Sequence, residues 1–178
     1  MAKALLITTT DIKRFTIIDG NVDNDKFIQY ISIAQDIHAQ QYLGTDLLEK
    51  IQSLITAGTI DDVGNADYKT LLETYIKPLL IHWAFVTYIP FAAYTIANGG
   101  VYKHQSESSV TAEKNEVDYL QEQARNMAQH YTRRFIDYVC ENSNLYPEYS
   151  TNSGADVNPA KESNFGGWVL TLAMLFLI

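Results

Sequence analysis

A helix that stops and restarts within residues 25–57 constrains this fold more than any other feature of the sequence. Apolar residues recur there at steps of three and four, so within each half they share one helical face. Asp23 or Asn24 can cap the first helix with a side-chain oxygen. Gly44 suits a helix end that requires a left-handed residue, and Thr45 can then cap the second helix. The segment is therefore predicted to be a compact helical hairpin without a recognisable catalytic residue. The two apolar faces consist of Phe27, Ile31, Ala34, His38 and Tyr42, and of Leu47, Leu48, Ile51, Leu54 and Ile55.

Two longer helical patterns follow, over residues 66–97 and 111–142. The first contains Pro78 and Pro90, each of which lacks an amide donor and predicts a kink. The polar segment 99–110 between the two patterns is predicted to form a loop or a small β-hairpin. The sequence thus predicts an all-α fold, a bundle of two long antiparallel helices plus the shorter helical hairpin. The predicted apolar stripe of the second long helix consists of Val117, Leu120, Ala124, Met127, Tyr131 and Tyr138.

The composition changes near the C-terminus, which predicts an arm. Residues 150–164 are rich in Ser, Thr, Asn and Gly and are predicted to be a flexible linker, whereas residues 168–178 are apolar almost throughout. We therefore divide the chain into a helical domain, 1–149, and an arm, 150–178. As a helix the apolar segment would span ~16 Å, too little to cross a hydrocarbon core of ~30 Å. It could fold back onto its own domain, fill a groove or add a strand on another subunit or partner, or anchor to a membrane; we predict no membrane partner.

Little in the sequence indicates chemistry. Thirteen Lys and Arg stand against 21 Asp and Glu, and the net charge of −8 opposes electrostatic binding of nucleic acid. The single cysteine, Cys140, cannot form an internal disulfide. The histidines lack the spacing of metal ligands and are predicted to be surface or interface residues: His38, His82, His104 and His130. Neither a glycine-rich phosphate loop nor a nucleophile elbow occurs, so no catalytic, cofactor or metal site is predicted and the chain is not expected to be an enzyme.

The order of the predicted elements carries a resemblance to a known family. The chain opens with Leu-Ile-Thr-Thr-Thr-Asp-Ile-Lys at 6–13, continues with a helix at 25–42 that ends in Tyr-Leu-Gly-Thr at 42–45, and then has a short second helix and two long ones. Over residues 5–149 this order resembles the head–tail connector (adaptor, or head-completion) proteins of tailed double-stranded DNA phages. The chain also looks like the ring proteins of crAss-like gut phages. The arm, 150–178, departs from the shorter adaptors.

The resemblance implies a structural protein of the virion, made in the host cytoplasm and placed at the head–tail junction. Such proteins form a ring, usually twelvefold, beneath the portal protein. The ring extends the channel through which double-stranded DNA passes without sequence-specific binding, and it offers a docking face to the tail or to a second ring protein. The acidic charge of this chain suits a surface along which DNA slides.

Two regions are candidates for contacts with the portal or with neighbouring subunits. The polar segment offers Tyr102, Lys103 and His104. The arm offers Trp168, Val169, Leu170, Leu172, Met174, Leu175 and Phe176. The alternatives to a ring subunit are a monomeric helical protein-interaction module, a tail-completion protein and a small helical enzyme.

Overall fold

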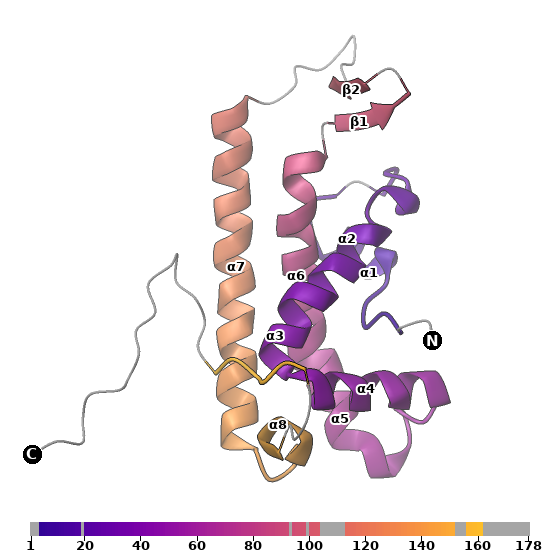
Figure 1. The fold of residues 1–178 in the computed structure, drawn as a ribbon, viewed down its shortest axis with the longest axis vertical. Coiled ribbons are helices and arrows are strands. Elements are labelled where there is room, and N and C mark those ends of the chain that lie inside the picture. Colours follow the sequence, from indigo (N-terminus) through magenta and orange to yellow (C-terminus); the bar gives the residue numbers. More distant parts are fainter. Residues whose placement is uncertain are drawn as a thin grey trace, which may run out of the picture.

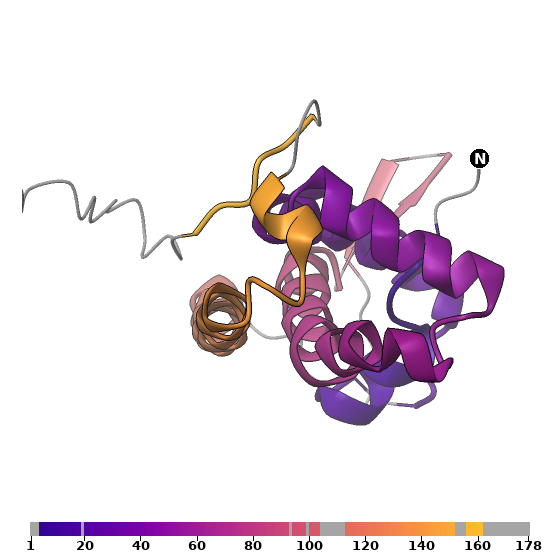
Figure 2. The same cartoon turned by 90° about the horizontal axis from the view of Figure 1, so that it is seen from below.

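The computed structural model describes residues 4–18, 20–92, 94–98, 100–103, 113–151 and 156–161. These residues are mostly helical, which confirms the predicted all-α class. Helices α6 (Lys77–Tyr88) and α7 (Lys114–Glu141) lie side by side and run in opposite directions (Figure 1). The helices of the N-terminal half pack on the other sides of α6, so α6 is the central element of the structure (Figures 1 and 2).

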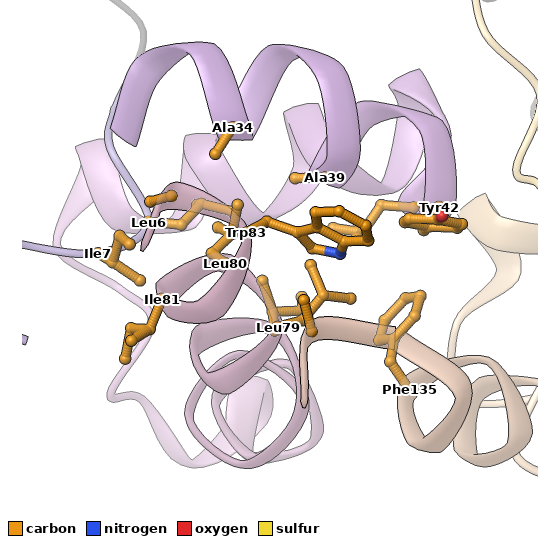
Figure 3. Packing of buried hydrophobic residues seen from close by; sticks show 14 of the residues in the cluster. Leu6, Ile7, Ala34, Ala39, Tyr42, Leu79, Leu80, Ile81, Trp83 and Phe135 are labelled. Atoms are coloured by element: carbon orange, nitrogen blue, oxygen red, sulfur yellow. The ribbon is translucent and has the colours of Figure 1, made fainter. Parts of the chain in front are cut away.

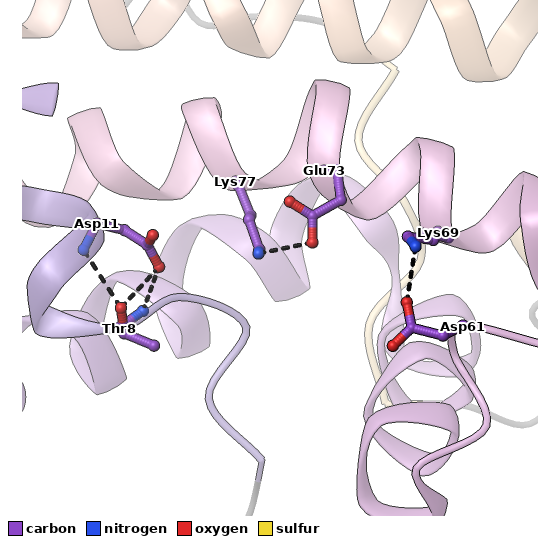
Figure 4. Close-up of polar contacts among 6 residues, drawn as sticks. All are labelled: Thr8, Asp11, Asp61, Lys69, Glu73 and Lys77. Atoms are coloured by element: carbon purple, nitrogen blue, oxygen red, sulfur yellow. Dashed lines mark hydrogen bonds and ion pairs between the residues drawn. The ribbon is translucent and has the colours of Figure 1, made fainter. Parts of the chain in front are cut away.

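The N-terminal half begins with α1 (Thr9–Phe15), which starts at a capping box. The Thr8 backbone N–H and hydroxyl both donate to Asp11 Oδ2, and the Asp11 N–H donates to Thr8 Oγ1 (Figure 4). As predicted, Asp23 caps the next helical turn by accepting from the Asp25 N–H at 3.1 Å. The elements that follow are η1 (Asn24–Lys26), α2 (Ile28–Ala34), the π turn η2 (Gln35–Ala39), α3 (Gln40–Leu43) and α4 (Thr45–Ala57).

The junction between α3 and α4 differs from the prediction in one respect. Gly44 has φ 76° and ψ 166°, a conformation open essentially to glycine alone. The prediction that Thr45 caps α4 is wrong, because Gly44 is the capping residue and no side chain caps the helix. The Thr45 hydroxyl instead accepts hydrogen bonds from Gln40 Nε2 and from the Val157 N–H. Gly58 ends α4 in the left-handed conformation, with φ 69° and ψ 18°.

The first long helix pattern is interrupted where its prolines predict. A π turn, η4 (Leu72–Ile76), precedes Pro78, which lies in the first turn of α6. Pro90 lies in the 3₁₀ turn η5, in which the regular helix ends. The elements of this region are η3 (Val63–Asn65), α5 (Ala66–Leu71), η4, α6 and η5 (Ile89–Phe91). Exposed ion pairs join Lys69 to Asp61 and Lys77 to Glu73 (Figure 4), and contribute little at such exposure.

The segment after η5 corrects two boundaries. The helix predicted to reach residue 97 ends near Phe91, and β1 (Tyr94–Ala97) pairs with β2 (Gly100–Lys103) in an antiparallel hairpin. The small hairpin considered for 99–110 therefore begins earlier, at Tyr94. The missing amide of Pro90 stops the helix, after which the β-branched pair Thr95-Ile96 favours extended backbone. Residues 104–112 lie outside the described part of the chain.

The core lies around α6. Seven of its residues are buried on all sides of the helix, which explains why this segment is almost uncharged: Leu79, Leu80, Ile81, Trp83, Ala84, Phe85 and Val86. In Figure 3, Trp83 lies between α6 and the N-terminal helices beside Tyr42, and Leu79 lies on the side of α6 nearer Phe135 of α7. The small residues Ala124 and Ala128 of α7 are fully buried, and their size allows close approach of the two helices.

The C-terminal part returns to the N-terminal half. After α8 (Pro147–Thr151), residues 156–161 run along the surface from the α3–α4 junction toward α7 (Figures 1 and 2). The Thr45 N–H donates to the Val157 carbonyl at 3.0 Å, and the Ala160 N–H donates to the Gln41 carbonyl at 2.8 Å. The described part of the predicted linker is therefore fixed to the α3–α4 junction. The division of the chain at residue 149 stays a prediction.

Candidate docking groove

An apolar groove of about 670 Å³ opens at the end of the structure where α6 stops and α7 begins. Its walls come from three places that are distant in sequence. The loop after α1 provides Ile17, Ile18 and Val22; the end of α6 and η5 provide Phe85, Tyr88, Ile89 and Pro90; the first turns of α7 provide Lys114, Val117, Asp118 and Leu120. Ala92 and Tyr94 complete the lining.

The groove lies beside the first turns of α7, which contribute no fully buried side chain. From Ala124 to Val139, α7 presents buried residues to the core, but residues 114–123 contain none. The chain before Ala124 is polar and begins with a capping box, in which Glu116 Oε2 accepts from the Glu113 N–H at 2.8 Å. Gln121 Nε2 donates to the Val86 carbonyl of α6 at 3.2 Å, and Val117 is partly buried against the core. The side chains of Val117 and Leu120 also line the groove.

Aromatic rings hold the wall that α6 provides. The Tyr88 ring meets the Phe27 ring at 6.0 Å and the Tyr30 ring at 5.4 Å, both edge to face, and Tyr30 stacks on Phe91 at 5.7 Å. Burial raises the pKa of the Tyr88 hydroxyl, with Tyr30 adding to the rise, so this wall stays neutral at physiological pH. The wall is thus apolar, uncharged and fixed by packing.

Large apolar side chains are exposed around the groove. Ile17 is 74% exposed, Tyr94 52% and Leu120 38%. The charged rim consists of Lys114 and Asp118, one of each sign. An apolar hollow with exposed apolar residues at its edge is typical of a surface that another molecule covers.

The structure locates only part of the predicted interface. Tyr102 and Lys103 lie on β2, where they pair in register with Thr95 and Tyr94, and Tyr94 lines the groove. His104 lies outside the described residues, and so do all the predicted arm residues: Trp168, Val169, Leu170, Leu172, Met174, Leu175 and Phe176. Their contacts stay predictions.

Sequence reasoning missed the groove itself. Val117 and Leu120 belong to the predicted stripe of α7, but periodicity alone cannot show that their side chains line a groove instead of being fully buried. The pair Ile17-Ile18, in a loop after a helix end, was the available signal, because such a pair needs either a core or a partner. The loop from Ile17 to Val22 and the start of α7 meet only in the folded chain.

Two of the histidines are half-buried and pack on aromatic rings, while the predicted surface or interface roles stay predictions. His38 stacks on Trp83, with ring centroids 3.8 Å apart, and His82 stacks on Tyr131 at 4.9 Å. Neither Nδ1 atom has a hydrogen-bond partner among the described residues. Burial, aided by the charge of Arg125, lowers the pKa of His38 to about 4, and burial also lowers the pKa of His82. Both rings are therefore neutral packing groups at pH 7, while His130 is exposed.

Within the described ranges, no three side chains of His, Cys, Asp and Glu lie close enough together to hold a metal ion. No helix in the same ranges combines the length and apolar character needed to cross a bilayer.

The comparisons with known proteins give one match. No curated protein sequence and no solved structure matches the chain. The model of DUF6712, a family of unknown function, matches residues 39–159. These residues run from the end of η2 through α7 and α8 into the segment that is bound at the α3–α4 junction. The match covers more than half of the chain, which therefore belongs to the DUF6712 family.

Proposed function

We propose that this chain is a structural subunit of a ring at the head–tail junction of a tailed double-stranded DNA phage. In this proposal the ring contains about twelve copies, lies beneath the portal protein, extends the DNA channel and receives the tail or a second ring. The kind of assembly proposed, a ring at the head–tail junction, comes from the resemblance of the element order to connector proteins. The observation that carries the proposal is the apolar groove with its exposed rim, because such a surface requires a partner.

The bundle supplies what a ring subunit needs. In the proposed subunit, α6 and α7 form an antiparallel rod and the α2–α4 hairpin packs against it, with the β1–β2 hairpin at one end (Figure 1). A closed ring uses heterologous contacts, in which one surface of a copy meets a different surface of the next. The groove lies at the β1–β2 end, so it can serve as one of the two surfaces and leaves the rest of the rod for the other.

The charge agrees with a channel wall. The net charge of −8 repels phosphate, so DNA can pass without being held. The adjacent arginines of α7 have different partners: Arg134 lies over the Tyr75 ring at 5.0 Å, and Arg133 pairs with Asp137 at 3.6 Å. Arg133 and Arg134 therefore do not converge on one site, so they do not form a pair that could hold a DNA phosphate.

Imaging tests this proposal. Purified full-length chain, alone and mixed with the portal protein of the same virus, should give closed rings by electron microscopy, and a map of the virion should contain the chain between portal and tail. Density at the distal end of the tail would favour the tail-completion alternative. A chain that stays monomeric with the portal protein and is absent from the particles would overturn the proposal and favour a monomeric interaction module.

A further inference from the structure

We propose that the groove receives residues 168–178 of a second copy of this chain. The inference rests on the proposed function, because it requires that copies of the chain assemble. It deepens that function by naming the contact that would join the copies. Donor and acceptor lie on different parts of the chain, so each copy can give one segment and accept another.

The groove and the segment match in chemistry. The lining is apolar apart from Lys114 and Asp118 at the rim, and the Tyr88 wall is neutral. Ten of the eleven residues from Trp168 to Ile178 are apolar, and only Thr171 is polar. Burial of apolar surface is the main driving force for such contacts. The other long segment outside the described residues, 104–112, contains only two apolar residues and offers no such match.

The position of the last described residue favours a second copy over the same copy. Lys161 Nζ lies 5.9 Å from the Tyr149 ring, and that ring packs against Phe135 of α7. Val117, in the groove, lies 18 residues before Phe135, or about 27 Å along the helix. The seven steps from Lys161 to Trp168 span at most ~25 Å when fully extended. Within one copy, seating the whole of residues 168–178 in the groove would therefore require a nearly fully extended linker along α7.

The opposite placement of donor and acceptor defines the kind of assembly. The last described residue before the segment, Lys161, lies near the C-terminal half of α7, whereas the groove lies at the N-terminal end of that helix. A contact between unlike surfaces is heterologous, and its repetition gives a ring when the rotation closes. The same contact repeated without closure would give a filament.

Cysteine cross-linking tests which copy donates the segment. In a Cys140→Ser background, which removes the natural exposed thiol, one tagged chain carries Leu120→Cys and a differently tagged chain carries Leu172→Cys. After mixing and mild oxidation, we expect a disulfide-linked heterodimer on a non-reducing gel. Asn126→Cys replaces Leu120→Cys in the control, because Asn126 is exposed and lies nine residues, or about 180°, from Val117 on α7; this pair should give little product.

Three results would overturn the inference. Equal cross-linking at Asn126 would show unspecific contact. A chain with both Leu120→Cys and Leu172→Cys that forms its disulfide within the monomer at high dilution would place the segment in its own groove. Absence of any cross-link at the highest soluble concentration would assign the groove to a different partner.

Charge substitutions provide an independent measurement on the full-length chain. Leu120→Asp in the groove and Leu172→Asp in the segment should each weaken self-association at least about tenfold in analytical ultracentrifugation, because each places a charge in an apolar contact. Asn126→Asp, the matched change outside the groove, should associate like wild type. Circular dichroism checks that the variants fold, which the 38% exposure of Leu120 favours. Wild-type association of the Leu120→Asp chain would overturn the inference.

Failure of this inference can be told apart from failure of the proposed function. Rings or virion necks that contain the chain, together with no cross-link between Leu120→Cys and Leu172→Cys, would leave the proposed function standing and remove the inference. A specific cross-link between copies, together with absence of the chain from virions, would do the reverse.

Discussion

Trp83 and Thr132 join α6 to α7 through a buried hydrogen bond of 2.9 Å from the indole Nε1 to the threonine Oγ1. The Thr132 hydroxyl in turn donates to the Ala128 carbonyl at 2.8 Å, so it both accepts and donates a hydrogen bond within the core. Thr132 is fully buried and Trp83 nearly so. A polar pair of this kind fixes the register of the two helices, because sliding either helix would leave the indole N–H without an acceptor.

Thr132→Val should lower the free energy of unfolding by about 1–3 kcal/mol, since it keeps the shape of the side chain but leaves the buried indole N–H unpaired. Thr132→Ser is the matched control, because it retains the hydroxyl and should lose less. Urea unfolding followed by tryptophan fluorescence measures both changes. Equal stability of wild type and Thr132→Val would show that the hydrogen bond does not hold the helices in register.

The stability lost when a glycine is replaced by alanine should depend on the backbone angles at that position. Gly44→Ala should cost about 1–3 kcal/mol, because its φ of 76° with ψ 166° is open essentially to glycine alone. Gly58→Ala, in the left-handed helical conformation, should cost about 1–2 kcal/mol. Gly64→Ala is the control, since it has no positive φ and nothing within 4 Å of an added Cβ. Thermal unfolding ranks the three variants, and a Gly64→Ala loss as large as that of Gly44→Ala would contradict the explanation.

Thr45→Val should loosen the C-terminal segment without unfolding the bundle. The substitution removes the acceptor of the Val157 N–H, at 3.1 Å, while the backbone bond from the Thr45 N–H to the Val157 carbonyl remains. Amide hydrogen exchange at Val157 should therefore become faster by several-fold, in keeping with the loss of one hydrogen bond of about 1 kcal/mol. Thr45→Ser retains the hydroxyl and should exchange like wild type. Unchanged protection in Thr45→Val would mean that the backbone bonds alone hold the segment.

His38 should make the protein less stable in acid. Its pKa is about 4 in the folded chain and 6.5 in the unfolded chain, so between these values the unfolded state binds more protons. The contribution of His38 to stability is therefore fully present above pH 6.5 and is lost as the pH falls toward 4, by up to about 3 kcal/mol.

His38→Phe keeps a ring stacked on Trp83 but cannot titrate, so its stability should fall less than that of wild type between pH 7 and pH 4.5. His130→Gln, at an exposed position, is the control and should follow the wild-type curve. Chemical unfolding at a series of pH values gives the comparison, and parallel curves for wild type and His38→Phe would contradict the assigned pKa shift.

The predicted apolar stripe of α7 shows what the spacing of apolar residues could not determine, namely which residues of the helix are buried. Met127 belongs to the predicted apolar face but is 46% exposed, whereas Ala128 and Thr132 are fully buried. Periodicity treats large apolar side chains as the buried ones. The packing of α7 against α6 places small residues in the contact instead, because a larger side chain there would push the helices apart.

Local signals determined the helices of this protein. Side-chain caps, positive-φ glycines, prolines and three- and four-residue spacing act on neighbouring residues, so the sequence alone indicated the break at Gly44, a kink at Pro90 and the nearly uncharged central helix. The end of that helix near Phe91 came only from the structure. Tertiary structure decided which face of α7 is buried, where the groove opens, and that residues 156–161 bind at Thr45. These depend on contacts between residues as much as 119 positions apart, as in the bond between Ala160 and Gln41, and such contacts form only when helix packing brings the segments together.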